Sequence, residues 1–346
     1  MEPIRILALD GGGMRGIIPA RFLQLLENRL NDQRRSNGLV PKPLHSYFDI
    51  IAGTSTGGLI AAALTVPDAT RPSLPKYNLQ QVIDIYLKDG QRIFPKPGIW
   101  RKVKGYVLGG ETLYAPDGIE AVLREKMGEV RLKQTLKPVL ICSYDIFNNE
   151  PRFFKTREAF ETEEENFSLF HACRSTSAGP TYFPPCHFTH GKREFNCIDG
   201  GVYINNPSIG ALAELIKHSR YYVGDRRIDD TLSNVHVLSV GTGRYNGQLS
   251  IKESEQMSAV KWIQPLLDIM MYGVNQTTDY VQKQVLLEKT NYIRFNVKVK
   301  EAKYSAMDNA APDALNYWDT LSKEEFGRRA ADLDVFMRAS GMSTQA

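Results

Sequence analysis

The amino-acid sequence predicts an α/β fold built on a largely parallel β-sheet. Short apolar runs that suit buried strands recur along the chain, and the run at 4–9 precedes a segment, 17–35, with apolar residues at helical spacing. The order of strand, turn and helix is repeated after the runs at 47–53 and 194–201. Because strands that alternate with helices usually pair in parallel, we expect one sheet covered by helices.

The rest of the chain divides into segments of different composition. Residues 67–116 are rich in Pro, Gly, Lys and Arg with interleaved aromatic residues, which is typical of an inserted cap rather than of a sheet layer. Residues 253–346 read as a mainly helical C-terminal part. We find no internal repeat and expect a single domain over 1–346. Further buried strands are expected at 137–146, 234–243 and 291–297.

Composition and charge are those of an ordinary globular protein. Of the 346 residues 42% are hydrophobic and 24% are charged, and the formal net charge is +4. So small a charge gives no reason to expect a nucleic-acid polymer as partner, although it permits attraction to an anionic surface. The cysteines include no C-x-x-C pair, and Cys142 lies in an apolar run, so we expect no disulfide framework, a buried free thiol at Cys142 and a reducing, cytoplasmic compartment. They are Cys142, Cys173, Cys186 and Cys197.

No segment of the sequence is typical of a membrane span. The N-terminus carries an acidic residue, Glu2, and only a short apolar run, so it does not read as a signal peptide. The longest weakly polar stretch, 48–66, is interrupted by Asp49, glycines and hydroxyl side chains. We therefore expect a protein that is at most peripheral to a membrane.

Ser55 is the first candidate catalytic residue. It lies in "GTSTG", a G-x-S-x-G pattern between a buried strand and an apolar helix. In this context the pattern predicts a nucleophile elbow, in which Gly53 and Gly57 permit a tight turn that presents the hydroxyl. The N-terminus of the following helix favours negative charge. The alternative is a glycine-rich loop that matches the pattern by chance.

A serine nucleophile needs a base, and no histidine lies in a recognisable motif. His187 and His190 are expected in an exposed turn, whereas His218 and His236 are expected to be structural. Asp199 is the stronger candidate. It ends a predicted strand, at the sheet edge where the sites of α/β proteins assemble. Taken by itself, Asp199 is better explained by a simple Asp-Gly turn, and only its combination with Ser55 favours a catalytic role.

The glycine-rich segment "DGGGMRG", residues 10–16, fits the pattern G-x-G-x-x-G. A dinucleotide-binding turn would require an acidic residue about twenty positions later, at the end of a second strand. Asp32 is at about that distance but follows a helical segment. Three consecutive glycines and Arg15 suit instead a nest of backbone amides that accepts an oxyanion or a phosphate. The nucleotide interpretation stays open as the second possibility.

The motifs "DGGGMRG", "GTSTGG" and "DGG", in this order, resemble those of the patatin-like phospholipases. The likeness continues through "SYDIFNNEPRFF", "ACRSTSAGPTYFPP" and "VLSVGTG" and covers most of residues 4–243. It implies a three-layer α/β/α fold and a Ser–Asp dyad without a catalytic histidine, with Ser55 as nucleophile and Asp199 as its activator. The implied oxyanion loop is formed by Gly11, Gly12 and Gly13, with Arg15 steadying it. The DGG motif supplies Gly200 and Gly201.

The resemblance implies an enzyme that hydrolyses fatty acyl esters of membrane phospholipids through an acyl-serine intermediate. No metal or cofactor is expected, because the sequence holds neither H-E-x-x-H nor calcium-loop spacing. A phospholipid membrane surface is the expected partner, and a homo-oligomer stays open. The basic and aromatic segment 88–104 is expected either to contact anionic lipid or to be a solvated cap.

The sequence leaves several functions open. The chain begins almost at its first strand, which favours a bacterial or other intracellular member of the family. Some bacterial members are anti-phage effectors of the CBASS type, activated by a cyclic nucleotide, although we find no motif for such an activator. Two further possibilities belong to different classes: a nucleotide-binding dehydrogenase, which would use the first glycine loop, and a storage or binding protein with negligible activity.

Overall fold

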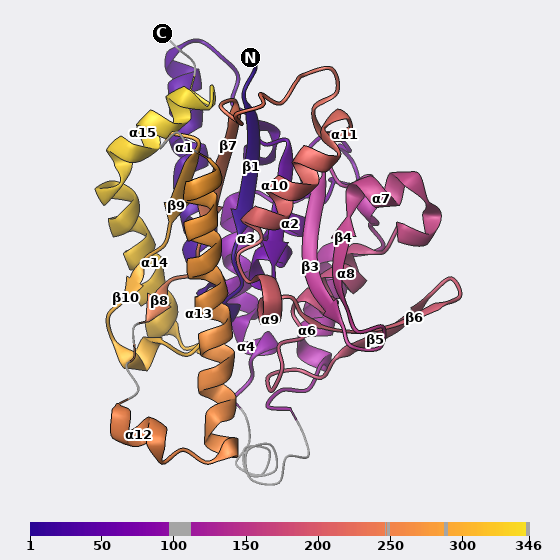
Figure 1. Cartoon of the computed structure of the whole chain (residues 1–346). Helices are drawn as coiled ribbons and strands as arrows, with labels where there is room; N and C mark the ends of the chain where they lie inside the picture. The colour runs from indigo at the N-terminus through magenta and orange to yellow at the C-terminus, as the bar shows by residue number, and fades with distance from the viewer. Residues whose placement is uncertain (97–111, 246, 248–249, 287–289, 344–346) are drawn as a thin grey trace.

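A central β-sheet runs through the molecule, with strand order β5-β6-β3-β2-β1-β7-β9 and β4 paired to β3 (Figure 1). The computed structural model describes residues 1–96, 112–245, 247, 250–286 and 290–343. The strands of the main sheet are β1 (Ile4–Leu9), β2 (Ile50–Thr54), β3 (Val139–Asp145), β4 (Glu150–Lys155), β5 (Cys186–His190), β6 (Arg193–Asp199), β7 (Val235–Val240) and β9 (Tyr292–Phe295). A separate small pair joins β8 (Arg244–Tyr245) to β10 (Lys298–Val299).

Parallel pairing links β3, β2, β1, β7 and β9, whereas β4, β5 and β6 pair antiparallel with their neighbours. The predicted strands at 4–9, 47–53, 137–146, 194–201 and 234–243 are confirmed, and so is the one at 291–297. The predicted largely parallel sheet is therefore confirmed, with an antiparallel edge.

One prediction about this edge is wrong. His187 and His190 do not lie in an exposed turn but in β5, which pairs with β6. The reason is a period-two pattern: Cys186 and Phe188 are buried on one face of the strand, while His187 points to solvent. Polar residues between these apolar ones made the segment look like a loop.

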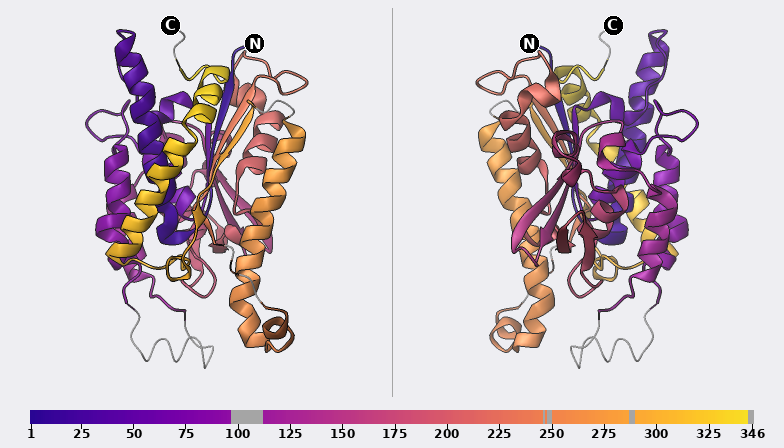
Figure 2. Two further views of the ribbon diagram at one scale, coloured as in Figure 1. Left: turned by 90° about the vertical axis from the view of Figure 1, so that its left-hand side faces the viewer. Right: turned by 90° about the vertical axis from the view of Figure 1, so that its right-hand side faces the viewer.

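Helices cover both faces of the sheet, so the three-layer α/β/α architecture is confirmed (Figure 2). The helices of one layer pack on the sheet in two buried cores. They are α1 (Ile17–Ser36), α2 (Thr56–Thr65), α3 (Leu79–Asp84), α6 (Asp117–Met127), α8 (Leu169–Thr176), α14 (Pro312–Arg328) and α15 (Ala330–Ala339). The opposite layer is formed by α9 (Gly201–Ile204), α10 (Ser208–Lys217), α11 (Ser219–Val223) and α13 (Ala259–Val285). The remaining described α-helices are the shorter α4 (Gly90–Ile93), α7 (Thr156–Glu161) and α12 (Ile251–Glu255).

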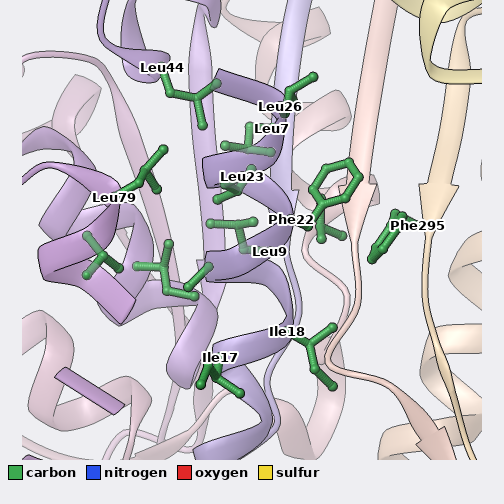
Figure 3. Close-up of a cluster of buried hydrophobic side chains, with 14 of the residues drawn as sticks. Leu7, Leu9, Ile17, Ile18, Phe22, Leu23, Leu26, Leu44, Leu79 and Phe295 are labelled. Atoms are coloured by element: carbon green, nitrogen blue, oxygen red, sulfur yellow. The ribbon is translucent and has the colours of Figure 1, made fainter. Parts of the chain in front are cut away.

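Alternation along β1 explains why both faces are apolar. Leu7 and Leu9 belong to the core under α1, whereas Ile4 and Ile6 belong to the core under α10. Figure 3 shows the first of these cores, where the amphipathic helix α1 packs onto the sheet. There the ring centroids of Phe22 and Phe295 lie 4.1 Å apart.

The segment expected to be a cap, 67–116, is described only in part, because 97–111 lie outside the described residues. Its described portion holds α3, a π-helical turn at Ile85–Asp89 and α4. Leu79 and Val82 of α3 are buried in the same core as α1, so this portion belongs to a helical layer. In the described part of the chain, no helix is both long enough and apolar enough to cross a bilayer. All four cysteines are free and buried, so the buried free thiol predicted at Cys142 is confirmed.

A buried ion pair anchors the exit of β1. Asp10 is 1% exposed and accepts hydrogen bonds from both terminal nitrogens of Arg294 on β9, with Nη1 3.1 Å from Oδ1. The same Nη1 lies 2.6 Å from the Ser239 hydroxyl oxygen. Burial raises the pKa of Asp10 and Arg294 opposes that rise. Removing one partner would leave the other charge buried without compensation.

We therefore expect Arg294→Met to lower the free energy of unfolding by about 3–5 kcal/mol, measured by urea denaturation. The matched control is Arg35→Met, which breaks an exposed i,i+3 pair with Asp32 and should cost less than about 1 kcal/mol. Equal losses in the two variants would contradict the assigned role of the buried pair.

Candidate active site

Ser55 occupies a strained turn between β2 and α2. Its backbone has φ 54° and ψ −126°, an arrangement that L residues rarely adopt and that costs about 1–3 kcal/mol. The Ser55 amide donates to the Thr176 hydroxyl oxygen at 2.8 Å, and that hydroxyl donates to the Cys142 carbonyl on β3. Hydrogen bonds through Thr176 to β3 thus hold the strained turn in place, as expected for a nucleophile elbow.

The two glycines flanking Ser55 are required by close packing. A Cβ at Gly53 would overlap the carbonyl group of Gly57 one turn later. A Cβ at Gly57 would overlap the carbonyl oxygen of Leu9 at the end of β1. Side chains at either position would therefore push α2 away from the sheet, and Ser55 with it.

The register of the sheet brings Asp199 to Ser55. On β3, Cys142 pairs with Thr54, the last residue of β2, and the next residue, Ser143, pairs with Asp199, the last residue of β6. Because β4 fills the other edge of β3, β2 and β6 run toward each other along the same edge, and their C-terminal ends meet there. Asp199 was predicted as the end of a sheet strand, but the antiparallel direction of β6 was not foreseen.

Asp199 is a buried carboxylate whose hydrogen-bond partners in the described part of the chain are uncharged. It is 9% exposed, and Oδ1 accepts a hydrogen bond from the Gly201 amide at 2.7 Å. Burial raises the pKa of Asp199 to about 6, while hydrogen bonds from the Ser55 side chain and the Gly201 amide oppose the rise. Gly200 is also tightly placed, because a Cβ there would lie 2.5 Å from the Cys142 carbonyl oxygen. A carboxylate with this pKa can accept a proton near neutral pH.

The glycine loop lies beside the same turn. Both backbone groups of Gly11 already make hydrogen bonds within the protein: its amide donates to the Asn205 carbonyl at 3.2 Å, and its carbonyl accepts from the Thr242 hydroxyl at 2.6 Å. Within the described residues, the amides of Gly12 and Gly13 have no such acceptor. Gly13 has φ 57°, so glycine is favoured at that position.

Arg15 joins this loop to α13. Its side chain is 3% exposed, and Nη1 lies 3.2 Å from the Tyr272 hydroxyl oxygen, across 257 positions of sequence. Asn205 makes a second link to α13, with Nδ2 3.2 Å from Oδ1 of Asn275. The loop near the N-terminus is therefore held by a helix from the C-terminal part of the chain.

Four of these positioning residues were not identified from the sequence. Thr176 lies in the stretch "ACRSTSAGPTYFPP" and Thr242 in "VLSVGTG", so hydroxyl residues inside these stretches were a usable signal. Asn205 follows the DGG motif closely. Nothing in the sequence marks Tyr272, whose role depends on the packing of α13.

Ser55 and Asp199 line one cavity, which we call the outer cavity and which encloses about 650 Å³ including space open to solvent. Gly12, Gly13 and Gly201 also line it, and apolar side chains supply much of the remaining wall. None of the six histidines, which all belong to the described part of the chain, lines this cavity. The arrangement can carry out acyl transfer with a serine nucleophile and a carboxylate base.

The nucleotide interpretation finds less support. Asp32, considered for a nucleotide ribose, lies on α1 with a 73% exposed side chain paired to Arg35. The glycine loop is followed by this helix, so no second strand ends near Asp32. Among the described residues, no group of three or more His, Cys, Asp or Glu side chains could hold a metal ion.

Comparison with known proteins agrees with the geometry. The family model described as "Patatin-like phospholipase" matches residues 7–212. The chain is 34% identical to "Patatin-like protein 3" of Arabidopsis thaliana, over 85% of this chain and 73% of that protein. It is 31% identical to "Patatin-17" of Solanum cardiophyllum, over 90% and 80% of the two chains.

A third relative, "Probable inactive patatin-3-Kuras 1" of Solanum tuberosum, is 30% identical over 90% of this chain and 83% of that protein. Its name describes a family member that is thought to be inactive. These matches span most of the chain, and the first family motif and the elbow lie within the matched region. The chain belongs to the patatin-like phospholipase family.

Proposed function

We propose that this protein is a lipid acyl hydrolase that cleaves fatty acyl esters of membrane phospholipids with a Ser55–Asp199 dyad. Family membership supports lipid acyl hydrolysis in general. The observation that carries the dyad is that the strained elbow places Ser55 in the same cavity as Asp199, a buried carboxylate whose pKa is raised by burial and lowered by the Ser55 side chain. The apolar walls of the outer cavity favour a substrate with hydrocarbon chains.

The reaction begins when the Ser55 hydroxyl gives its proton to Asp199 and its oxygen attacks the ester carbonyl carbon. The ester C–O bond then breaks, and the leaving oxygen takes the proton from Asp199. Water next gives a proton to Asp199 and attacks the acyl-serine. The fatty acid leaves as the Ser55 oxygen recovers that proton. Asp199 thus serves as base and acid in turn.

The negative charge that develops on the carbonyl oxygen needs hydrogen-bond donors. The amides of Gly12 and Gly13 are the candidates, because both residues line the outer cavity with Ser55. Gly11 instead supports the loop, since its amide already donates to Asn205. Each oxyanion donor is worth about 2.7–4 kcal/mol of barrier lowering in comparable enzymes.

Loss of either member of the dyad should abolish hydrolysis. We expect Ser55→Ala and Asp199→Asn each to lower kcat at least about 10³-fold on phospholipid vesicles, because groups that act as a unit fail together. His187→Ala and His190→Ala are the controls and should retain activity, since both residues lie on β5 away from the cavity lining. Inactivation by either histidine substitution would contradict the dyad.

Activity should depend on the ionisation of Asp199. Because the base must be ionised, kcat/KM should fall as the pH is lowered through about 6. The raised pKa means that the folded state holds this proton more tightly than the unfolded chain, so Asp199 lowers stability as the pH rises from about 4 to about 6. Asp199→Asn should therefore stabilise the protein more at pH 8 than at pH 4 in thermal unfolding. A flat activity profile from pH 5 to pH 8 would contradict this assignment.

We propose that the enzyme meets the membrane through the N-terminal half of α13. Leu266 and Ile269 are 48% and 52% exposed, and the adjacent Met270 is 42% exposed while it also lines the outer cavity. Apolar side chains at a cavity mouth that holds a lipid ester are suited to insertion among lipid chains. Of the basic segment 88–104, residues 97–104 lie outside the described ones, and Lys88 and Arg92 are paired with acids.

Leu266→Glu/Ile269→Glu should reduce cosedimentation with phospholipid vesicles and slow vesicle hydrolysis at least about tenfold, because two charges would have to enter the apolar region. Hydrolysis of a soluble butyryl ester should be unchanged. Ile216→Glu is the matched control, because Ile216 is similarly exposed, at 46%, but lies near the C-terminal end of α10 and does not line the outer cavity. Equal binding by the double variant and this control would exclude α13 as the contact.

Gating by a cyclic nucleotide stays an expectation that rests on the resemblance alone. The vesicle assay separates it from constitutive activity if it is run with and without a panel of cyclic nucleotides. A storage or binding role is separated by a fluorophosphonate probe, which labels an activated serine. Absence of labelling at Ser55 together with absence of hydrolysis would favour that role.

A further inference from the structure

Two cavities meet at Ser55. Besides the outer cavity, an inner cavity of about 680 Å³, including space open to solvent, lies beneath α2 and α6. The two share five lining residues: Gly13, Ser55, Phe94, Ser177 and Phe183. An ester bound at the Ser55 oxygen therefore has two spaces for the two groups on either side of its scissile bond.

The two cavities differ in how deeply their walls are buried. The outer cavity reaches the surface at Met270, which is 42% exposed. The inner cavity is lined largely by core residues, including Ile60, Val122 and Leu123, which are at most 3% exposed. The inner cavity therefore runs deeper into the core than the outer one.

The inner cavity is chemically suited to a hydrocarbon chain. Its walls come from α2, α3, the π-helical turn and α6, and most of its side chains are apolar. Its few polar groups are satisfied within the protein: the Tyr86 and Thr56 hydroxyl oxygens lie 2.6 Å apart, and Nζ of Lys126 lies 3.0 Å from Oδ2 of Asp89. A polar head group that entered this cavity would give up its hydrogen bonds to water without replacement, whereas an acyl chain makes no hydrogen bonds and would lose none.

The position of Asp199 distinguishes the two spaces. Asp199 lines the outer cavity but not the inner one. In the proposed reaction the leaving oxygen takes a proton from Asp199, and the water that attacks the acyl-serine gives a proton to it. Both must therefore lie within hydrogen-bond reach of this carboxylate, on the outer side.

We propose that the acyl chain of the substrate occupies the inner cavity and that the leaving lyso-lipid occupies the outer cavity. This inference rests on the proposed function and adds to it which side chains select the chain length. Leu123 and Met127, one turn apart on α6, line the inner cavity together with Lys126. The length of acyl chain that the enzyme accepts is set by these residues of α6.

The test compares two ratios of kcat/KM. The first ratio compares decanoyl with butyryl 4-nitrophenyl esters and reports on the acyl side. The second ratio compares S-benzyl with S-methyl butanethioate, two thioesters of one acyl group, and reports on the leaving-group side. Leu123→Trp should lower the first ratio at least about tenfold and leave the second within about twofold.

The matched variant is Val202→Trp, because Val202 lines only the outer cavity. It should lower the second ratio and leave the first within about twofold. Leu59→Trp is a second inner variant at a half-buried position, for use if Leu123→Trp does not fold. The opposite pattern, or no change in either ratio in folded variants, would overturn the assignment.

Failure of this inference can be separated from failure of the proposed function. If wild-type protein hydrolyses none of the esters, or if Ser55→Ala retains activity, the proposed function is wrong. If wild-type protein is active and Ser55→Ala is not, unchanged ratios overturn only the assignment of the two cavities.

Discussion

The active-site geometry depends on one hydroxyl group, that of Thr176. It accepts the Ser55 amide hydrogen and donates to the Cys142 carbonyl, and so ties the strained elbow to β3. Cys142 and its neighbour Ser143 are the residues of β3 opposite which the C-terminal ends of β2 and β6 meet. The hydroxyl therefore holds the nucleophile at the place where the sheet delivers Asp199. Strain of about 1–3 kcal/mol at Ser55 persists because several elements fix this point together.

Two buried aspartates near this point have different environments. Asp10 is held by two nitrogens of Arg294, so its charge is compensated and it anchors the start of the glycine loop. Asp199 has a hydroxyl and an amide as partners, and its pKa of about 6 reflects burial beside uncharged donors. Burial of a carboxylate thus gives a structural anchor where an arginine faces it and a titrating base where neutral groups do.

The sequence was sufficient for features that depend on local patterns. The buried strands, the elbow at Ser55 and the α/β class follow from apolar runs and glycine positions within short windows. Asp199 was correctly predicted to end a strand. Its position close to Ser55, however, results from the pairing of β2 and β6 with β3, which no local sequence pattern predicts. Thr176 contacts Ser55 across 121 positions, so its role depends on long-range packing, and the stretch around it was the one usable signal in the sequence. β5 was mistaken for a turn because the exposed polar residues His187 and Thr189 alternate with the buried Cys186 and Phe188.

The C-terminal part contributes more to the site than the motifs suggest. The family model ends at residue 212, whereas Met270 and Met271 of α13 and Met307 line the outer cavity. Tyr272 and Asn275 on the same helix contact Arg15 and Asn205, which support the glycine loop. One face of α13 therefore fixes the loop, while exposed apolar residues lie near its N-terminal end. Because the same helix shapes the cavity mouth and braces the loop, a change in its position would alter both access to Ser55 and the placement of the amides at Gly12 and Gly13.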